Sequence, residues 1–456
     1  MSRRATSSTR PPRHPDGIPP GHWDENQAPD GYQPRNPSLL ERSRHWLRGP
    51  DDLAARNRQN VLIDGIGVGF AAGIGTFLSV FLVRLGASNF MVGLLTAMPA
   101  LTGILLAFQV GAFLSRQRQV VPWFSRARLF VLSCYVLTGL VPYLFDQHVP
   151  EIIVGIWALA TLPQTVVSVA FSVVMGQVAG PRGRVALMSQ RWSTLGLANA
   201  LAVLLAGQLL QHWDFPLNYQ IIFLISAIGG LVSYSFSIRI SLPDQEAPPA
   251  PSGRGSPWRQ ELGVLRQYPD FLRFTASQFI FRAGLSMAMP LLPLYWVREL
   301  KASDMTISFI NTAQTVVLLV AYLLWTRLAK RTGERRVLLI CAFGASFYPF
   351  LTALTHSTGP LAIYAGINGF FQAGVDLVFF DIMLDTCPPQ NQARYIGLYQ
   401  TTVFTAMFLA PLTGTWLADH FSLGWGLLIA SALRLGGFVL LYLLGVGRGL
   451  KSEAAG

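Results

Sequence analysis

Twelve apolar stretches, each long enough to cross a lipid bilayer, recur along the chain. A transmembrane helix needs about 20 mostly apolar residues, and lipid offers no hydrogen-bond partners to a backbone that is not helical or part of a closed barrel. Charged residues make up 13% of the chain, about half of the share in a typical soluble protein. The sequence therefore predicts an all-α membrane protein with about twelve transmembrane helices. The stretches cover residues 60–83, 89–114, 123–145, 150–175, 186–210, 219–238, 271–297, 306–325, 337–355, 360–384, 395–417 and 424–446.

A repeated segment divides these stretches into two sets of six. Residues 82–95 read LVRLGASNFMVGLL, and residues 296–309 read WVRELKASDMTISF. In each copy a serine, Ser88 or Ser303, is in position to cap the second helix of its set, with the following Asn or Asp against the positive helix end. An even number of helices per set keeps both sets in the same orientation, so we expect two parallel, pseudo-symmetric six-helix halves.

The polar segments predict the domain boundaries. The first segment is rich in Pro, Arg, Ser and Asp and predicts a disordered cytoplasmic tail, within which residues 38–48 have the pattern of a short interfacial helix. A Pro-, Gly- and Ser-rich segment between the two sets predicts a cytoplasmic hinge loop. The predicted parts are the tail 1–57, the N-terminal bundle 58–238, the hinge 239–270, the C-terminal bundle 271–447 and a second cytoplasmic tail 448–456.

The positions of the basic residues predict the orientation in the membrane. Arginine and lysine gather in the loops that follow the second, fourth, sixth and eighth stretches, whereas the loops on the other side hold only Arg84, Arg298 and Lys301. By the positive-inside rule both termini are cytoplasmic. The net charge of +12 follows this distribution, so we expect the lipid bilayer and no nucleic acid as a partner. We expect a monomeric, multi-pass protein of the plasma membrane.

The basic loop after the second stretch of each half carries a recognisable signature. Residues 111–119 read GAFLSRQRQ, and residues 326–336 read TRLAKRTGERR. Together with the two six-helix halves and the hinge, they resemble the major facilitator superfamily, whose loop signature is Gly-x-Leu-Ala-Asp-Arg-x-Gly-Arg-Arg. Ser115 and Lys330 occupy the position of the acidic residue, which puts a carboxylate-based lock at this loop in doubt.

The resemblance covers residues 58–447 and implies the fold and the mechanism of that family. It implies two bundles that rock about a central cavity lined by the first and fourth helices of each half. It also implies cytoplasmic gate loops, to which we add the arginines that open the matching segments RVALMSQ and RYIGLYQ. The predicted gate-loop residues are Gly111, Arg116, Arg331, Gly333, Arg335, Arg184 and Arg394.

Polar side chains within the apolar stretches form a candidate solute pathway. Ionisable groups inside a membrane usually mark such pathways. The seventh and tenth stretches each carry three polar residues at a spacing of four, and the fourth stretch carries a weaker polar stripe. Arg282 and Asp376 fall at nearly the same depth, so we expect them to pair or to compete for substrate, with a purely structural ion pair as the alternative. The candidate pathway residues are Gln164, Gln278, Arg282, Asn368, Gln372 and Asp376.

Two further charged residues lie within the stretches. Asp64 near the start of the first stretch, like Asp376, is a candidate for proton coupling; the alternative is that it pairs with Arg56 or Arg58 at the membrane boundary. Arg434, in the last stretch, either extends toward the membrane surface or faces Asp376 from behind.

The sequence thus predicts a secondary active transporter that moves a small polar or anionic organic solute by alternating access, with proton coupling as an option. The alternative is a non-transporting protein of the same fold: a receptor, a lipid or pigment delivery factor, or an assembly factor. No histidine falls within the stretches and no catalytic pairing such as His-Glu-x-x-His occurs. We therefore expect no enzyme, no cofactor and no metal site.

Overall fold

The computed structural model describes residues 52–243, 268–386 and 392–446. Within these ranges the regular structure is helical throughout, and twelve helical segments are long and apolar enough to cross a membrane. The predicted all-α membrane fold with twelve spans is confirmed. Residues 38–48 and most of the predicted hinge lie outside the described residues, and the predicted domain boundaries remain predictions.

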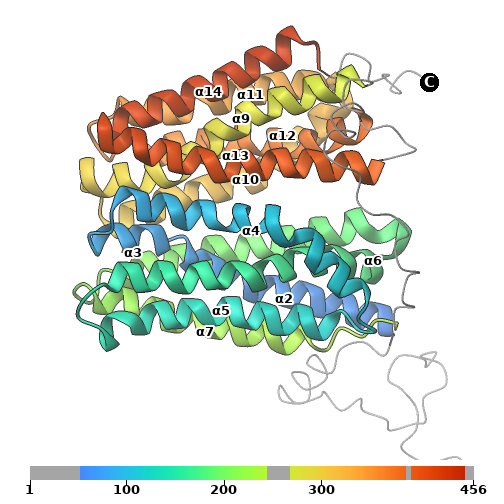
Figure 1. The fold of residues 1–456 in the computed structure, drawn as a ribbon, viewed down its shortest axis with the longest axis horizontal. Coiled ribbons are helices and arrows are strands. Elements are labelled where there is room, and N and C mark those ends of the chain that lie inside the picture. The colour runs from blue at the N-terminus through green and yellow to red at the C-terminus, as the bar shows by residue number, and fades with distance from the viewer. Residues whose placement is uncertain (1–51, 244–267, 387–391, 447–456) are drawn as a thin grey trace, which may run out of the picture. The chain divides into compact units, whose positions relative to one another are not determined.

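The first six spans form one bundle and the last six form another (Figure 1). The two bundles pack against each other through α4 with α13 and through α6 with α10. The helices of the first bundle are α2 (Leu53–Gly75), α3 (Leu78–Arg84), α4 (Asn89–Ser115), α5 (Val121–Leu144), α6 (Val149–Leu209) and α7 (Leu217–Ser237). Those of the second are α9 (Pro269–Leu294), the π-helix η2 (Tyr295–Glu299), α10 (Asp304–Thr332), α11 (Glu334–Ala353), α12 (Leu361–Thr386), α13 (Gln392–His420) and α14 (Leu423–Leu443).

Several helix bounds differ from the sequence prediction. The fourth and fifth spans, Val149–Ala179 and Leu187–Leu209, are both present as expected, but the backbone between them stays helical, so both belong to α6 where we expected a basic loop. The first span is interrupted between α2 and α3, where the Thr76 hydroxyl donates to the Gly73 carbonyl at 2.7 Å. The predicted disordered tail is wrong at its end, because α2 begins at Leu53. Its first turn is capped by Asp52, whose carboxylate accepts from the Ala55 amide at 3.0 Å.

The two predicted serine caps are confirmed. Ser88 Oγ accepts from the Met91 amide and Ser303 Oγ accepts from the Thr306 amide, each at 3.2 Å. These caps satisfy amides that have no partner within the helix. Each capped helix therefore begins at a defined residue, a few residues after the helix whose last turn carries the repeated arginine.

Close helix packing in the first bundle depends on glycine. A Cβ atom added to Gly67 of α2 would lie 2.6 Å from the Gly229 carbonyl oxygen and 2.7 Å from the Ser233 amide nitrogen of α7. Small residues allow such close approach between membrane helices. α2 and α7 therefore touch backbone to backbone, which brings their polar side chains within hydrogen-bond distance.

Candidate functional site

Polar residues inside the second bundle, on α9 and α12, form the candidate solute site; we call Gln278, Arg282, Asn368, Gln372 and Asp376 the polar cluster. Gln278, Asn368 and Gln372 are buried, whereas Arg282 and Asp376 are half-buried. Gln278 is completely buried, and neither its amide nitrogen nor its amide oxygen has a hydrogen-bond partner among the described residues. Gln372 donates to Asp376 Oδ1 at 2.8 Å, while its own Oε1 has no partner there. The Oδ1 atom of buried Asn368 is also without one.

Arg282 and Asp376 are electrostatic neighbours, but the direct pair that we expected is not formed. Between the described residues no ion pair within 4.0 Å joins them. Arg282 instead lies with its guanidinium carbon 5.6 Å from the centre of the Phe379 ring and beside the Tyr399 side chain of α13. The two charges are thus held by different neighbours, and each remains available to a third group.

Gln164, the pathway candidate from the first bundle, is exposed on α6 and makes no hydrogen bond to a described residue. The structure therefore brings together the predicted residues of the seventh and tenth spans, whereas Gln164 is not tied to them by any such contact. The polar cluster belongs to the second bundle alone.

Asp64 is the centre of a buried network in the first bundle, which we call the charge hub. Its carboxylate contacts Arg128 of α5 at 2.6 Å and Arg191 of α6 at 3.2 Å, and it accepts from the Ser233 hydroxyl at 2.7 Å. The predicted partners Arg56 and Arg58 are wrong, because α2 starts earlier than expected and Asp64 is 0% exposed. The hub joins four helices, α2, α5, α6 and α7.

Arg434 neither reaches the membrane surface nor faces Asp376. It is 2% exposed, and its guanidinium donates to the Ala345 carbonyl of α11 at 2.9 Å. Among the described residues it forms no ion pair with a carboxylate, and its Nε atom has no partner. Close packing against Gly284 of α9 holds the side chain inside the bundle.

The predicted gate-loop residues lie at the end of the bundles where α2 begins and α14 ends. Gly333 joins α10 to α11 with φ of 87°, a left-handed conformation that favours glycine. Arg335 donates to the Val446 carbonyl at 3.0 Å, so it binds the turn that follows the last helix. Gly111 and Arg116 lie in and just after the last turn of α4, Arg331 lies in the last turn of α10, and the side chains of Arg184 and Arg394 are outside the described residues.

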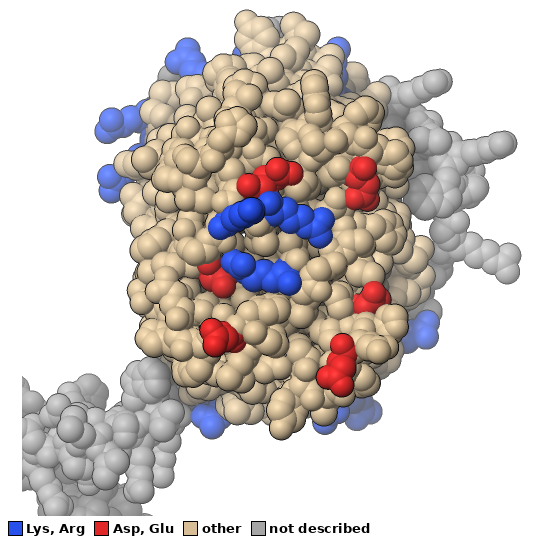
Figure 2. Space-filling model, turned by 90° about the vertical axis from the view of Figure 1, so that its left-hand side faces the viewer, with Lys and Arg blue, Asp and Glu red and all other residues tan. Residues whose placement is uncertain are grey.

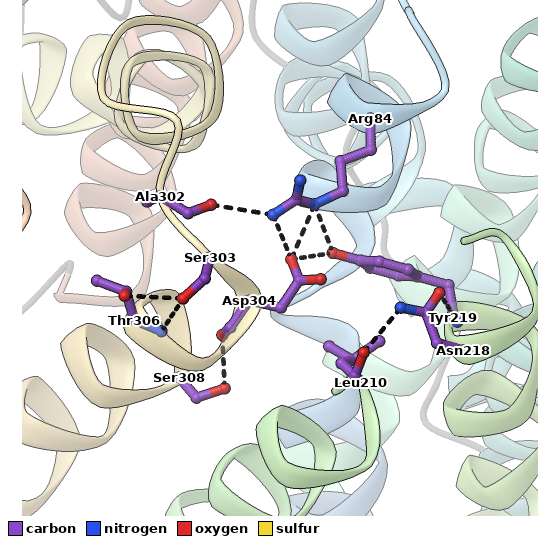
Figure 3. Close-up of polar contacts among 9 residues, drawn as sticks. All are labelled: Arg84, Leu210, Asn218, Tyr219, Ala302, Ser303, Asp304, Thr306 and Ser308. Atoms are coloured by element: carbon purple, nitrogen blue, oxygen red, sulfur yellow. Dashed lines mark hydrogen bonds and ion pairs between the residues drawn. The ribbon is translucent and has the colours of Figure 1, made fainter. Parts of the chain in front are cut away.

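The opposite end of the bundles carries a polar contact between the two halves, which we call the clasp. In its first arm, Arg84 at the end of α3 forms an ion pair with Asp304 of α10, with 2.6 Å between Nη2 and Oδ1 (Figure 3). Arg84 also donates to the Ala302 carbonyl at 3.0 Å. The Tyr219 hydroxyl of α7 donates to the same Asp304 oxygen at 2.6 Å, and Phe81 stacks on the Tyr219 ring at 4.8 Å.

The second arm has the same construction with the halves exchanged. Arg298 of η2 donates to Asn89 Oδ1 at 2.6 Å and to the Ala87 carbonyl at 2.5 Å. The Asn89 amide in turn donates to Asp419 Oδ1 of α13 at 2.6 Å. Asn89 and its counterpart Asp304 therefore do more than favour the start of their own helices, as the sequence predicted: each binds the arginine of the other half.

Seen from this end, basic side chains gather at the centre and acidic side chains lie around them (Figure 2). The basic residues here are Arg84 at the end of α3, Arg298 in η2 and Lys301 shortly after it, and Asp304 and Asp419 are acidic residues at the same end of the helices. The clasp was not predicted, although the sequence carries a signal for it: an arginine and an Asn or Asp recur at matching places in both copies of the repeat.

Groups of three or more His, Cys, Asp or Glu side chains that could hold a metal ion do not occur in the described parts of the chain.

Comparison with known proteins shows similarity to membrane transporters. Residues 274–455 match the family model described as Major Facilitator Superfamily. The multidrug export protein EmrB of Haemophilus influenzae is 28% identical over 98 residues, which are 22% of this chain and 19% of that protein. The multidrug resistance protein MdtG of Escherichia fergusonii is 28% identical over 153 residues, 32% of this chain and 36% of MdtG. The chain thus aligns with well under half of each of these two relatives.

Solved structures match over more of the chain. The nucleoside transporter NupG, as a point mutant, superimposes with a TM-score of 0.68 at 10% identity, covering 85% of this chain and 99% of the other. An inward-open structure of the xylose transporter XylE of Escherichia coli gives 0.63 at 14% identity, covering 88% and 97%. The second bundle matches the model of the Major Facilitator Superfamily, and the twelve-helix fold as a whole is that of the solved transporters.

Proposed function

We propose that this protein is a secondary active transporter that moves a small polar or anionic organic solute by alternating access. The observation that carries the proposal is the polar cluster, whose buried amide groups lack partners within a membrane-spanning bundle. An unsatisfied buried polar group costs about 1–3 kcal/mol, and lipid cannot satisfy it. A solute with matching donors and acceptors would remove that cost when it binds.

The depth of the cluster supports a transport site. Arg282 lies 13 residues after the start of α9, about 20 Å along the helix at 1.5 Å per residue. Asp376 lies 15 residues after the start of α12, about 22 Å by the same rise. These two helices run in opposite directions, so both charges fall near the middle of the membrane. Substrate sites of this class of transporter lie near the bilayer midplane.

The charges of the cluster suggest the type of solute. The Arg282 guanidinium has no carboxylate within 4.0 Å among the described residues, and its Nε has no partner. A guanidinium is suited to a carboxylate or phosphate, so an anionic or strongly polar solute fits better than a simple cation. Similar proteins include a staphyloferrin B transporter and a nucleoside transporter, which supports an organic solute in general.

Of the two candidates for proton coupling, we favour Asp376. The Asp64 carboxylate is enclosed by two arginines and a serine hydroxyl, which stabilise its charged form. Asp376 has one hydrogen bond from Gln372 and no cation within 4.0 Å among the described residues, and it is only partly buried. It can therefore exchange a proton during transport, whereas Asp64 serves to hold the first bundle together.

The orientation completes the proposal. With both termini in the cytoplasm, the clasp lies on the outer face of the plasma membrane, and while it is closed we expect solute to reach the cluster from the cytoplasmic side. We expect a single chain to act as the transporting unit, because each half contributes to both the clasp and the packed helix pairs between the bundles.

A ligand-stabilisation screen of the purified protein, followed by flux in proteoliposomes under an imposed pH gradient, tests the function. We expect organic anions or polar solutes to raise the unfolding temperature. Arg282→Gln and Asp376→Asn should each lower flux at least about tenfold, the equivalent of one charge-assisted hydrogen bond. Arg273→Gln is the matched control, because Arg273 is an exposed arginine of the same helix. Flux at the unmodified rate in both cluster variants, or a stably bound partner protein without flux, would contradict the proposal.

A further inference from the structure

The two arms of the clasp form a reciprocal contact. Arg84 of the first half binds Asp304 of the second, and Arg298 of the second half binds Asn89 of the first. In the repeat, the two arginines occupy the same place, as do the Asn and the Asp. In a two-fold symmetric interface, each contact between one residue and another is repeated with the two sides exchanged. The two arms show this pattern. The duplicated segment is therefore self-complementary, and each copy holds the other.

The clasp adjoins two tightly packed helix pairs that join the halves. A Cβ atom on Gly207 of α6 would lie 2.5 Å from the Ser308 Cβ of α10, and one on Gly93 of α4 would lie 2.6 Å from the Thr415 Oγ1 of α13. Ser308 and Thr415 are both 0% exposed. Ser308 lies one turn beyond Asp304, whose carbonyl accepts its hydroxyl proton at 2.9 Å. While the clasp is formed, neither helix pair admits water at these positions.

The clasp is more exposed to water than the charge hub, and this difference decides which of the two can open during transport. In the first arm, the side chains of Arg84 and Asp304 are 26% and 14% exposed, whereas Asp64 at the hub is 0% exposed. Water can replace a partly exposed ion pair at little loss, but it cannot reach a completely buried one. The hub is thus a permanent part of one bundle, and the clasp is a contact that can open and close.

From these observations we propose that the clasp is the lock of the gate at its end of the transporter, and that both arms must open before the polar cluster becomes accessible from that side. This inference rests on the proposed alternating-access function and adds which residues govern it. The two arms bind different helices: Arg84 of α3 binds the start of α10, which packs on α6, and Arg298, through Asn89 and Asp419, joins the start of α4 to the end of α13. The arms can therefore be tested separately.

The test measures the accessibility of a cysteine placed below each arm. The full-length protein with Cys387→Ser carries either Ser308→Cys or Thr415→Cys in lipid nanodiscs, and the rate of reaction with a charged maleimide is followed. The remaining native cysteines, Cys134 and Cys341, are buried, and a chain without the added cysteine gives the background rate.

Arg84→Ala should raise the labelling of Ser308→Cys, and Arg298→Ala that of Thr415→Cys, each at least about tenfold, the ratio expected when one charge-assisted hydrogen bond is lost. The exchange Arg84→Asp with Asp304→Arg should return labelling toward the starting rate, because the pair is restored with its charges reversed.

Arg273→Ala, which removes an exposed pair within one helix, should leave both rates unchanged. Unchanged labelling in both Arg84→Ala and Arg298→Ala would overturn the proposal, and so would an equal rise in the Arg273→Ala control, which indicates general loosening. Labelling needs no solute. A rise in the labelling rate without any detectable flux would therefore support the gate and contradict the proposed transport function. Flux with no change in the labelling rate of either variant would support the transport function and contradict the gate.

Discussion

Removing the carboxylate of the charge hub gives the most direct test of how the first bundle is held together. Asp64→Asn keeps the size of the side chain and removes its charge. Asp64 is 0% exposed, and the side chains of Arg128 and Arg191 are 6% and 3% exposed. The substitution therefore leaves two arginines in the bundle with no carboxylate between them.

The size of the effect follows from this burial. Removing one partner of a buried ion pair costs about 3–5 kcal/mol, because the remaining charge stays out of water without compensation. We expect Asp64→Asn to lower the free energy of unfolding by about that amount. Asp270→Asn is the matched control: its ion pair with Arg273 is 3.0 Å long, but the Asp270 side chain is 78% exposed, so its loss should cost less than about 1 kcal/mol.

The assay is equilibrium unfolding of the purified protein in mixed micelles, followed by tryptophan fluorescence. A triple variant, Asp64→Asn with Arg128→Gln and Arg191→Gln, should recover part of the lost stability, since replacing a whole buried network with neutral groups is less costly than breaking it. Unfolding of Asp64→Asn at the midpoint of the unmodified protein would show that the hub does not hold the bundle together. A triple variant less stable than Asp64→Asn alone would show the same.

Three further predictions concern stability, each measured by the same unfolding assay. Gly67→Ala should destabilise the protein because the added Cβ would overlap the backbone of α7. Gly111→Ala is the control: its added Cβ would have no atom within 4 Å, so this substitution should be neutral or stabilising. Equal effects of the two substitutions on stability would contradict the close packing of α2 on α7. Ser303→Ala should cost about 0.5–2 kcal/mol through loss of the cap, and a cost near zero would mean that water caps α10 equally well. Arg434→Met should increase the free energy of unfolding, because one hydrogen bond to a carbonyl does not offset the cost of burying a cation without a carboxylate partner. A lower free energy of unfolding would instead indicate that Arg434 has a partner outside the described residues.

The parts of the fold that depend on local properties could be predicted from the sequence. Apolar length identifies each span because the bilayer has a fixed thickness, and the serine caps of α4 and α10 follow from the few residues around them. The helix break between α2 and α3 and the continuous α6 were not predicted. In a run of apolar residues, composition says that a helix crosses the membrane but not where its backbone bends.

Partners of charged side chains were harder to predict than their positions. Asp64 lies six residues from Arg58 in sequence, yet its partners Arg128 and Arg191 are 64 and 127 residues away. Which arginine meets a carboxylate depends on the rotation of each helix about its own axis and on how the helices cross. Those quantities are set by packing across the whole bundle.

By itself, the sequence determined the number of spans, the duplication and the two sets of polar residues on the seventh and tenth spans. Only the tertiary structure decided that Arg282 and Asp376 lie near each other without pairing, and that the repeated arginines bind across the halves. A repeat in sequence states that two segments are alike. Whether like segments meet depends on the axis that relates the two bundles, and here that axis brings Arg84 to Asp304 and Arg298 to Asn89.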